Sequence, residues 1–259
     1  MFYLAVCAVM FALGVPMGFL GFAGAALVSG LLIVLFQVPV HLAFGTALGS
    51  VFATIVFGGW SHFREGNVDV LAAVQIGLAG VIGAYLGGSI ALATAAAQLK
   101  LIAGVLLLFN SVFMYVRMRF FSSGKENSAS GPAPRRVWRD LPGYGTIGLV
   151  CGLMSGFLGI GAIPFVQTGL LVKKGIDLNR IIGTSMFAMA LASISGAARF
   201  ALGGQLDGWL LSSVVLGMTA GSYIGAKMTR RAPRWLVKTG IVVTPFITGW
   251  LMILAPING

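Results

Sequence analysis

Few side chains in this sequence could carry chemistry, and their positions exclude several functions. The 259-residue chain has six acidic residues and two histidines. The acidic residues all fall in expected loops or at the ends of apolar runs: Glu65, Asp69, Glu126, Asp140, Asp177 and Asp207. Asp69 and Asp207 directly precede apolar runs, where a helix N-cap is expected. Carboxylates buried in membrane-spanning segments are typical of proton relays and cation pathways, so their absence favours an anionic ligand.

Catalysis would need a nucleophile beside a base, or a cluster of metal ligands. His41 and His62 lie near opposite ends of one apolar run, and Cys7 and Cys151 lie in two unrelated apolar segments. The sequence therefore predicts no catalytic residue, no metal site and no cofactor. Either histidine is a candidate for proton coupling, because imidazole titrates near neutral pH, and a structural role at the membrane interface is the alternative.

A small set of cationic and hydroxyl side chains could bind an anion. Arg199 lies near the end of an apolar run, where a guanidinium could hold an oxyanion through two hydrogen bonds. A snorkelling arginine at the membrane interface is the alternative. Thr46, Thr184 and Ser185 could donate hydroxyl hydrogen bonds to the same anion, or bond to their own helix backbone instead.

Two glycine-rich stretches indicate that backbone N–H groups could also bind the anion. "GFLGFAGAAL" at 18–27 and "GFLGIGAIPF" at 156–165 interrupt otherwise apolar segments. Glycine weakens a helix, so each stretch predicts a break followed by a new helix N-terminus. The N–H groups and the positive dipole end of such a terminus attract anions. We therefore expect an anion site at the two breaks, with the following glycines as candidates: Gly21, Gly24, Gly159 and Gly161. Close helix packing is the alternative role for these glycines.

The elements that carry these residues are membrane helices. The chain is 58% hydrophobic and 9% charged, against about 25% charged residues in soluble domains. Uncharged apolar runs near the roughly 20 residues of a membrane span recur along the chain: 42–61, 70–90, 101–116, 181–198, 208–226 and 239–257. The sequence predicts an all-α polytopic membrane protein. The net charge of +11 then reflects basic loops on one membrane face and not nucleic-acid binding.

The chain also contains an internal repeat. At an offset of 138 residues, GFLG at 18–21 aligns with GFLG at 156–159, and Gly66 aligns with Gly204. GAYLG at 83–87 aligns with GSYIG at 221–225 in the same register. We therefore expect one repeat over 1–118, a polar linker over 119–139 and a second repeat over 140–259.

Lysine and arginine positions indicate how the repeats are oriented. If 3–36 and 142–172 were each a single span, the basic residues would divide almost evenly between the two faces. If each glycine stretch turns its chain back as a hairpin, only Lys100 and Arg199 of the 17 lie outside. The positive-inside rule favours this second arrangement. It predicts two inverted repeats, each a broken-helix hairpin plus three spans, with both termini outside and the linker cytoplasmic. Each hairpin arm is expected to be too short to span the membrane comfortably, and the hairpin tips are expected to meet near the midplane.

The motif order "GFLGFAGAAL…HLAFGTALGS…SHFREGNVD…GAYLGG", with its second copy, resembles the sulfite exporter TauE/SafE family of bacterial membrane proteins. The resemblance extends over nearly the whole chain. It implies a multi-pass protein of the bacterial inner membrane that moves sulfite, sulfonates or related small anions. The family commonly has a richer G-x-G-G-G run than either copy carries here, and the resemblance therefore does not specify the substrate.

The function expected from these features is export of sulfite or a related small sulfur-containing or organic anion, driven by the membrane potential. Proton-coupled uptake through His41 or His62 is the alternative, and a non-transport membrane subunit is a remote one. The expected partners are the small anion and the lipid bilayer. Nucleic acid is excluded, and a homodimer is left open.

Overall fold

The described parts of the chain form helices. The computed structural model describes residues 1–20, 25–64, 66, 68–120, 141–172, 178–229, 243 and 246–254. In chain order the helices are α1 (Phe2–Leu20), α2 (Ala25–Val34), α3 (Val40–Arg64), α4 (Val70–Ala93), α5 (Ala96–Phe120), α6 (Leu141–Leu158), α7 (Ile163–Val172), α8 (Leu178–Leu202) and α9 (Gly208–Thr229). Residues 246–254 are also helical. The prediction of an all-α protein is confirmed for these ranges.

The expected apolar runs coincide with α3, α4, α5, α8 and α9, which extend beyond them by a few residues. Among the described residues, three helical stretches are long and apolar enough to cross a bilayer: Val70–Ala93, Ala96–Phe113 and Gly183–Leu202. Shorter apolar helical stretches cover Phe2–Met17, Ala25–Val34, Val40–Ile55 and Pro142–Leu158. This is the helix pattern of a membrane protein.

The helix boundaries recur at the offset found in the sequence. Adding 138 to the limits of α2 gives those of α7, and adding 138 to the limits of α3 gives those of α8. The turns after α3 and α8 are also equivalent, with φ of 71° at Gly66 and 70° at Gly204. The predicted caps are confirmed in both turns: Asp69 Oδ1 accepts the N–H of Ala72 at 3.1 Å, and Asp207 Oδ1 accepts the N–H of Trp209 at 2.9 Å.

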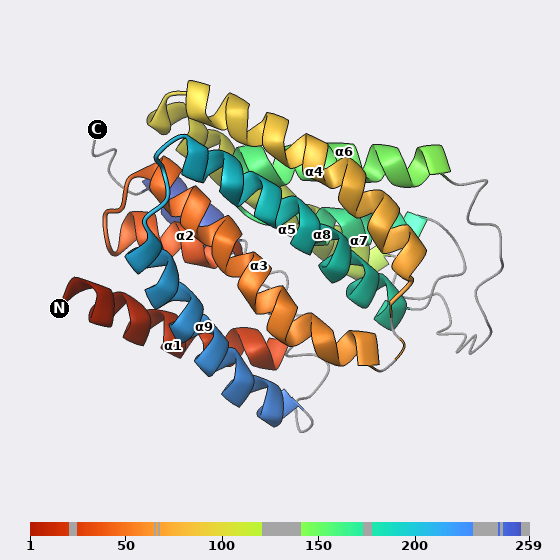
Figure 1. Ribbon diagram of the computed structural model, residues 1–259, viewed down its shortest axis with the longest axis horizontal. Helices are drawn as coiled ribbons and strands as arrows, with labels where there is room; N and C mark the ends of the chain where they lie inside the picture. Colours follow the sequence, from red (N-terminus) through yellow and green to blue (C-terminus); the bar gives the residue numbers. More distant parts are fainter. Residues whose placement is uncertain are drawn as a thin grey trace.

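The first helix of each half packs along the fourth helix of the other half (Figure 1). A Cβ built on Gly83 of α4 would lie 2.7 Å from Leu153 N of α6. The equivalent Cβ on Gly221 of α9 would lie 3.0 Å from Val15 N of α1. Glycine therefore lets the two backbones touch in both pairs, the close approach that small residues permit between membrane helices.

The third helices of the two halves, α3 and α8, lie side by side between those outer pairs (Figure 1). A Cβ on Gly45 would lie 2.8 Å from Phe200 Cβ, and a Cβ on Gly196 would lie 2.9 Å from Leu48 Cδ1. Going up α3 from Gly45 to Leu48, the facing residues of α8 go down from Phe200 to Gly196. These two equivalent helices run in opposite directions.

The second glycine stretch forms a hairpin with unequal arms. A Cβ on Gly169 of α7 would lie 3.2 Å from the Ile147 side chain, so α7 returns along α6. The 18 residues of α6 extend about 27 Å, whereas the 10 residues of α7 extend about 15 Å. Neither α6 nor the 19-residue α1 is among the described stretches long and apolar enough to cross a bilayer, which agrees with the expectation that each arm is too short to span comfortably. The two arms of this hairpin nevertheless differ in length, since α7 has only 10 residues.

Candidate functional site

The turn between α6 and α7 requires glycine at two positions. Gly159 and Gly161 have φ of 62° and 56°, in the left-handed region that favours glycine. The N–H of Gly159 donates to the Ser155 carbonyl oxygen at 2.9 Å, which ends α6 in the manner of a helix C-cap. Both glycines are buried. The break predicted from the sequence is therefore present at this position.

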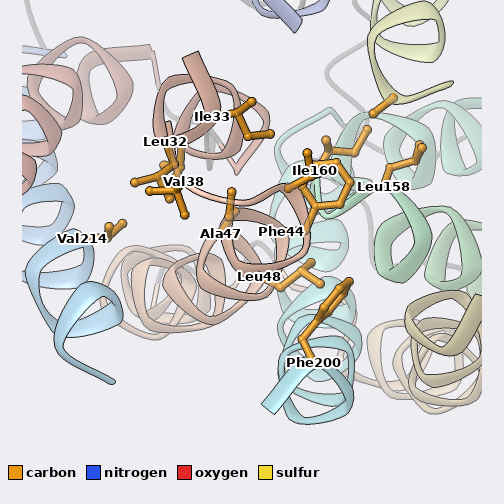
Figure 2. Packing of buried hydrophobic residues seen from close by; sticks show 14 of the residues in the cluster. Leu32, Ile33, Val38, Phe44, Ala47, Leu48, Leu158, Ile160, Phe200 and Val214 are labelled. Atoms are coloured by element: carbon orange, nitrogen blue, oxygen red, sulfur yellow. The ribbon is translucent and has the colours of Figure 1, made fainter. Parts of the chain in front are cut away.

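Neighbouring helices enclose this turn. A Cβ on Gly159 would lie 2.8 Å from Phe44 Cα, and Figure 2 shows Phe44 beside Leu158 and Ile160. A Cβ on Gly161 would lie 3.5 Å from the γ carbons of Val51. The turn therefore packs against α3, and a Cβ at Gly159 would collide with Phe44.

The turn also lies against the start of the other short helix. The Cβ position on Gly161 is 3.3 Å from Ala25 Cβ, and Ala25 is the first residue of α2. Its counterpart in the second half is Ile163, the first residue of α7. The two short helices thus begin next to each other. Gly21 and Gly24 lie outside the described residues.

Several backbone donors in the turn have no acceptor in the part of the chain that the structure describes. The N–H of Ile163 donates to Gly161 O at 2.5 Å, that of Phe165 donates to Ala162 O at 3.1 Å, and Pro164 has no N–H. Among the described residues, no acceptor faces the N–H groups of Ile160, Gly161 and Ala162.

Buried backbone N–H groups without a partner are rare in proteins. Successive N–H groups in a turn that alternates left-handed residues form the concave nests that bind anions. The α6–α7 turn therefore has the chemistry of an anion site. It differs from the expected one because the donors precede α7 and do not belong to its first turn.

The three predicted hydroxyl residues differ in their hydrogen bonds. Thr184 Oγ1 accepts the N–H of Asp69 at 3.0 Å, and Ser185 Oγ donates to Ile181 O at 2.6 Å within its own helix. Thr46, the repeat counterpart of Thr184, is fully buried, and its Oγ1 has no partner in the described part of the chain. Ser185 thus shows the backbone-bonded alternative.

Sequence reasoning missed two further hydroxyl residues, Ser155 and Ser193. Both are fully buried, and neither Oγ has a hydrogen-bond partner among the described residues. Ser155 lies in the last turn of α6, where its carbonyl accepts the N–H of Gly159. Its position directly before the second GFLG motif was the available signal.

The contacts described for Arg199 are with α4. Its Nε donates to Ser89 Oγ at 2.7 Å, and its Cζ lies 5.6 Å from the centroid of the half-exposed Tyr85 ring. Gly88 makes room for the arginine stem, since a Cβ there would lie 3.2 Å from Arg199 Cγ. A guanidinium over an aromatic face is a favourable cation–π arrangement. These contacts connect α8 to α4 and do not involve the α6–α7 turn.

The structure describes the side-chain contacts of His41 but not those of His62. His41 Nε2 lies 2.9 Å from Ala91 O and 3.2 Å from Thr94 O, at the C-terminal end of α4. Both partners are acceptors, so Nε2 carries the proton and donates to carbonyl groups at the end of the helix. Ala91 O also accepts the N–H of Thr94 at 3.0 Å. His62 lies in α3, and its side chain is outside the described set.

Comparison with known proteins gives consistent matches over most of the chain. Residues 6–252 match the sulfite exporter TauE/SafE family. The probable membrane transporter protein YdhB of Bacillus subtilis is 30% identical over 95% of this chain and 98% of its own length. A probable membrane transporter protein of Haemophilus influenzae is 26% identical over 93% of this chain and 94% of its own length. One of Xylella fastidiosa is 25% identical over 84% of this chain and 81% of its own length.

No solved structure matches the chain. The family match from residue 6 to residue 252, together with relatives named as transporters and the apolar helices, classifies the protein as a transporter and not an enzyme. The chain belongs to the sulfite exporter TauE/SafE family of membrane transporters.

Proposed function

We propose that this transporter exports sulfite or a related small sulfur-containing or organic anion, and that the anion binds where the two short helices begin. The observation that carries the proposal is the buried α6–α7 turn, whose N–H groups at Ile160, Gly161 and Ala162 have no acceptor among the described residues. Interrupted helices in the two halves of a transporter typically point their N-termini at an anionic substrate. The start of α2 beside Gly161 fits this arrangement.

The proposal includes two inverted repeats, 1–118 and 140–259, joined by a cytoplasmic linker at 119–139, most of which lies outside the described residues. Support comes from the opposite directions of α3 and α8 and from the reciprocal packing of α1 with α9 and of α4 with α6. The distribution of lysine and arginine supports the same arrangement. Both termini then lie outside a bacterial inner membrane.

The direction of transport follows from the membrane potential. Moving one charge through 100 mV is worth about 2.3 kcal/mol, which corresponds to a concentration ratio of roughly fifty for a monovalent anion. A negative cell interior therefore drives anions outward without a coupling ion.

Anion flux in proteoliposomes tests the proposed function. Sulfite, thiosulfate, sulfate and a sulfonate should be compared at potentials set by potassium gradients. We expect flux of at least one of these anions to rise with potential and to run out of the negative compartment without a pH gradient. Flux that requires a pH gradient and ignores the potential would support proton-coupled uptake instead.

Gly161 tests the position of the site. Gly161→Leu places a side chain in a left-handed turn against Val51 and Ala25, and we expect anion flux per inserted protein to fall at least tenfold. Gly145→Leu in α6 is the matched control, because a Cβ there meets nothing within 4 Å. Equal flux in the two variants would mean that the turn does not bind the substrate.

Arg199 tests whether a side-chain cation contributes to binding. Since its contacts connect α8 to α4, we expect Arg199→Lys and Arg199→Gln to keep the wild-type apparent affinity and to lower the melting temperature. The measurement is a concentration series of anion flux, normalised to inserted protein. A clear loss of affinity in Arg199→Lys, greater in Arg199→Gln, would instead place the guanidinium in the site, because an ammonium cannot supply its planar two-point geometry.

A further inference from the structure

The interior of the protein holds hydroxyl groups that do not form the bond usual for membrane helices. Serine and threonine within helices commonly donate to a backbone carbonyl three or four residues earlier. Ser50 does so to Ala47 O at 2.8 Å, and Ser185 does so to Ile181 O at 2.6 Å. Ser155 and Ser193 are equally buried, yet neither Oγ has a partner among the described residues.

These two serines lie on helices that meet beside the turn. Ser155 is one turn before Gly159 in α6, and Ser193 is almost one turn before Gly196 in α8. A Cβ on Gly196 would lie 3.7 Å from Gly156 Cα, next to Ser155 in the chain, and 2.9 Å from Leu48 Cδ1. Leaving a buried hydroxyl unpaired costs about 1–3 kcal/mol, so two such groups, neither with a partner among the described residues, favour a further partner that those residues do not supply.

The charge around the turn limits what that partner can be. The side chains placed against Gly159 and Gly161 belong to Phe44, Val51 and Ala25, and none of them is charged. Neutral N–H and O–H dipoles can compensate one buried negative charge. The desolvation cost rises steeply with charge, so a second charge is harder to compensate without a buried cation. The lining therefore favours a monovalent anion over a divalent one.

The hydroxyls add a preference that N–H groups alone cannot give. A backbone N–H only donates, whereas a serine hydroxyl donates one hydrogen bond and accepts others. A ligand with its own O–H group can therefore donate to a serine while its charged oxygens accept from the turn.

From these contacts we infer that Ser155 and Ser193 complete the site and select a monovalent oxyanion that still carries a proton. Hydrogensulfite is the member of the proposed substrate class that fits, in preference to the sulfite dianion. The inference rests on the proposed function and deepens it.

The test uses sulfite flux in proteoliposomes at two pH values on either side of the ionisation of hydrogensulfite to sulfite. For the wild type, we expect the two concentration curves to coincide when they are plotted against hydrogensulfite alone. Curves that coincide against total sulfite or against the dianion would overturn the inference. This measurement needs no variant.

Variants give the second arm of the test. Ser155→Ala and Ser193→Ala should each raise the apparent KM for hydrogensulfite roughly tenfold, the loss expected for a hydrogen bond to a charged ligand. Ser50→Ala is the matched control, a buried serine whose hydroxyl already has a backbone acceptor. If both variants matched Ser50→Ala, the serines would have no role in binding. If both variants match Ser50→Ala but the wild type still carries sulfite, the proposed function stands and only the role of the serines is overturned. If the wild type moves none of the tested anions, both proposals are overturned.

Discussion

Backbone that leaves helical hydrogen bonding inside a membrane must be enclosed by protein, and the rest of this structure follows from that constraint. Lipid offers no partner for a free N–H group, so a broken helix is tolerated only where other elements surround the break. Here Phe44 and Val51 of α3 close over Gly159 and Gly161, and the start of α2 lies beside the same turn. The enclosure protects the break from lipid and also removes water from its N–H groups. N–H groups that are shielded from water bind an anion more strongly, because hydrogen bonds are stronger where the local dielectric constant is low.

The enclosure depends on helices from both halves of the chain. The long helix before the turn, α6, is held by α4 of the first half, and α1 is held by α9 of the second. Glycines such as Gly83 and Gly221 bring these backbones into contact at equivalent places. Helix association in lipid depends on such close packing, since the hydrophobic effect that drives it in water is absent. The α6–α7 turn of the second half therefore packs against helices of the first half.

The sequence predicted features that follow from local composition and repetition. The apolar runs located α3, α4, α5, α8 and α9, and the glycine motif located the break at Gly159 and Gly161. The unequal lengths of α6 and α7 could not be predicted, because apolar residues continue through the motif and nothing local shows where the turn falls. The partners of Arg199 on α4 lie 110 residues away or more in the chain, and no pattern near Arg199 indicates them. Ser155 and Ser193 stand out only once burial and missing acceptors are known.

The central claim is that the two halves are inverted, and labelling of two equivalent turns tests it most directly. Gly66 and Gly204 occupy the same place in each half, have nearly the same φ, and have open space where a side chain would go. Gly66→Cys and Gly204→Cys are each made with Cys7 and Cys151 replaced by alanine, and are exposed to a thiol reagent that does not cross membranes. Our account predicts labelling of Gly204→Cys only from outside the cell and of Gly66→Cys only from the cytoplasmic side. Labelling of both cysteines from the same side would contradict the inverted arrangement.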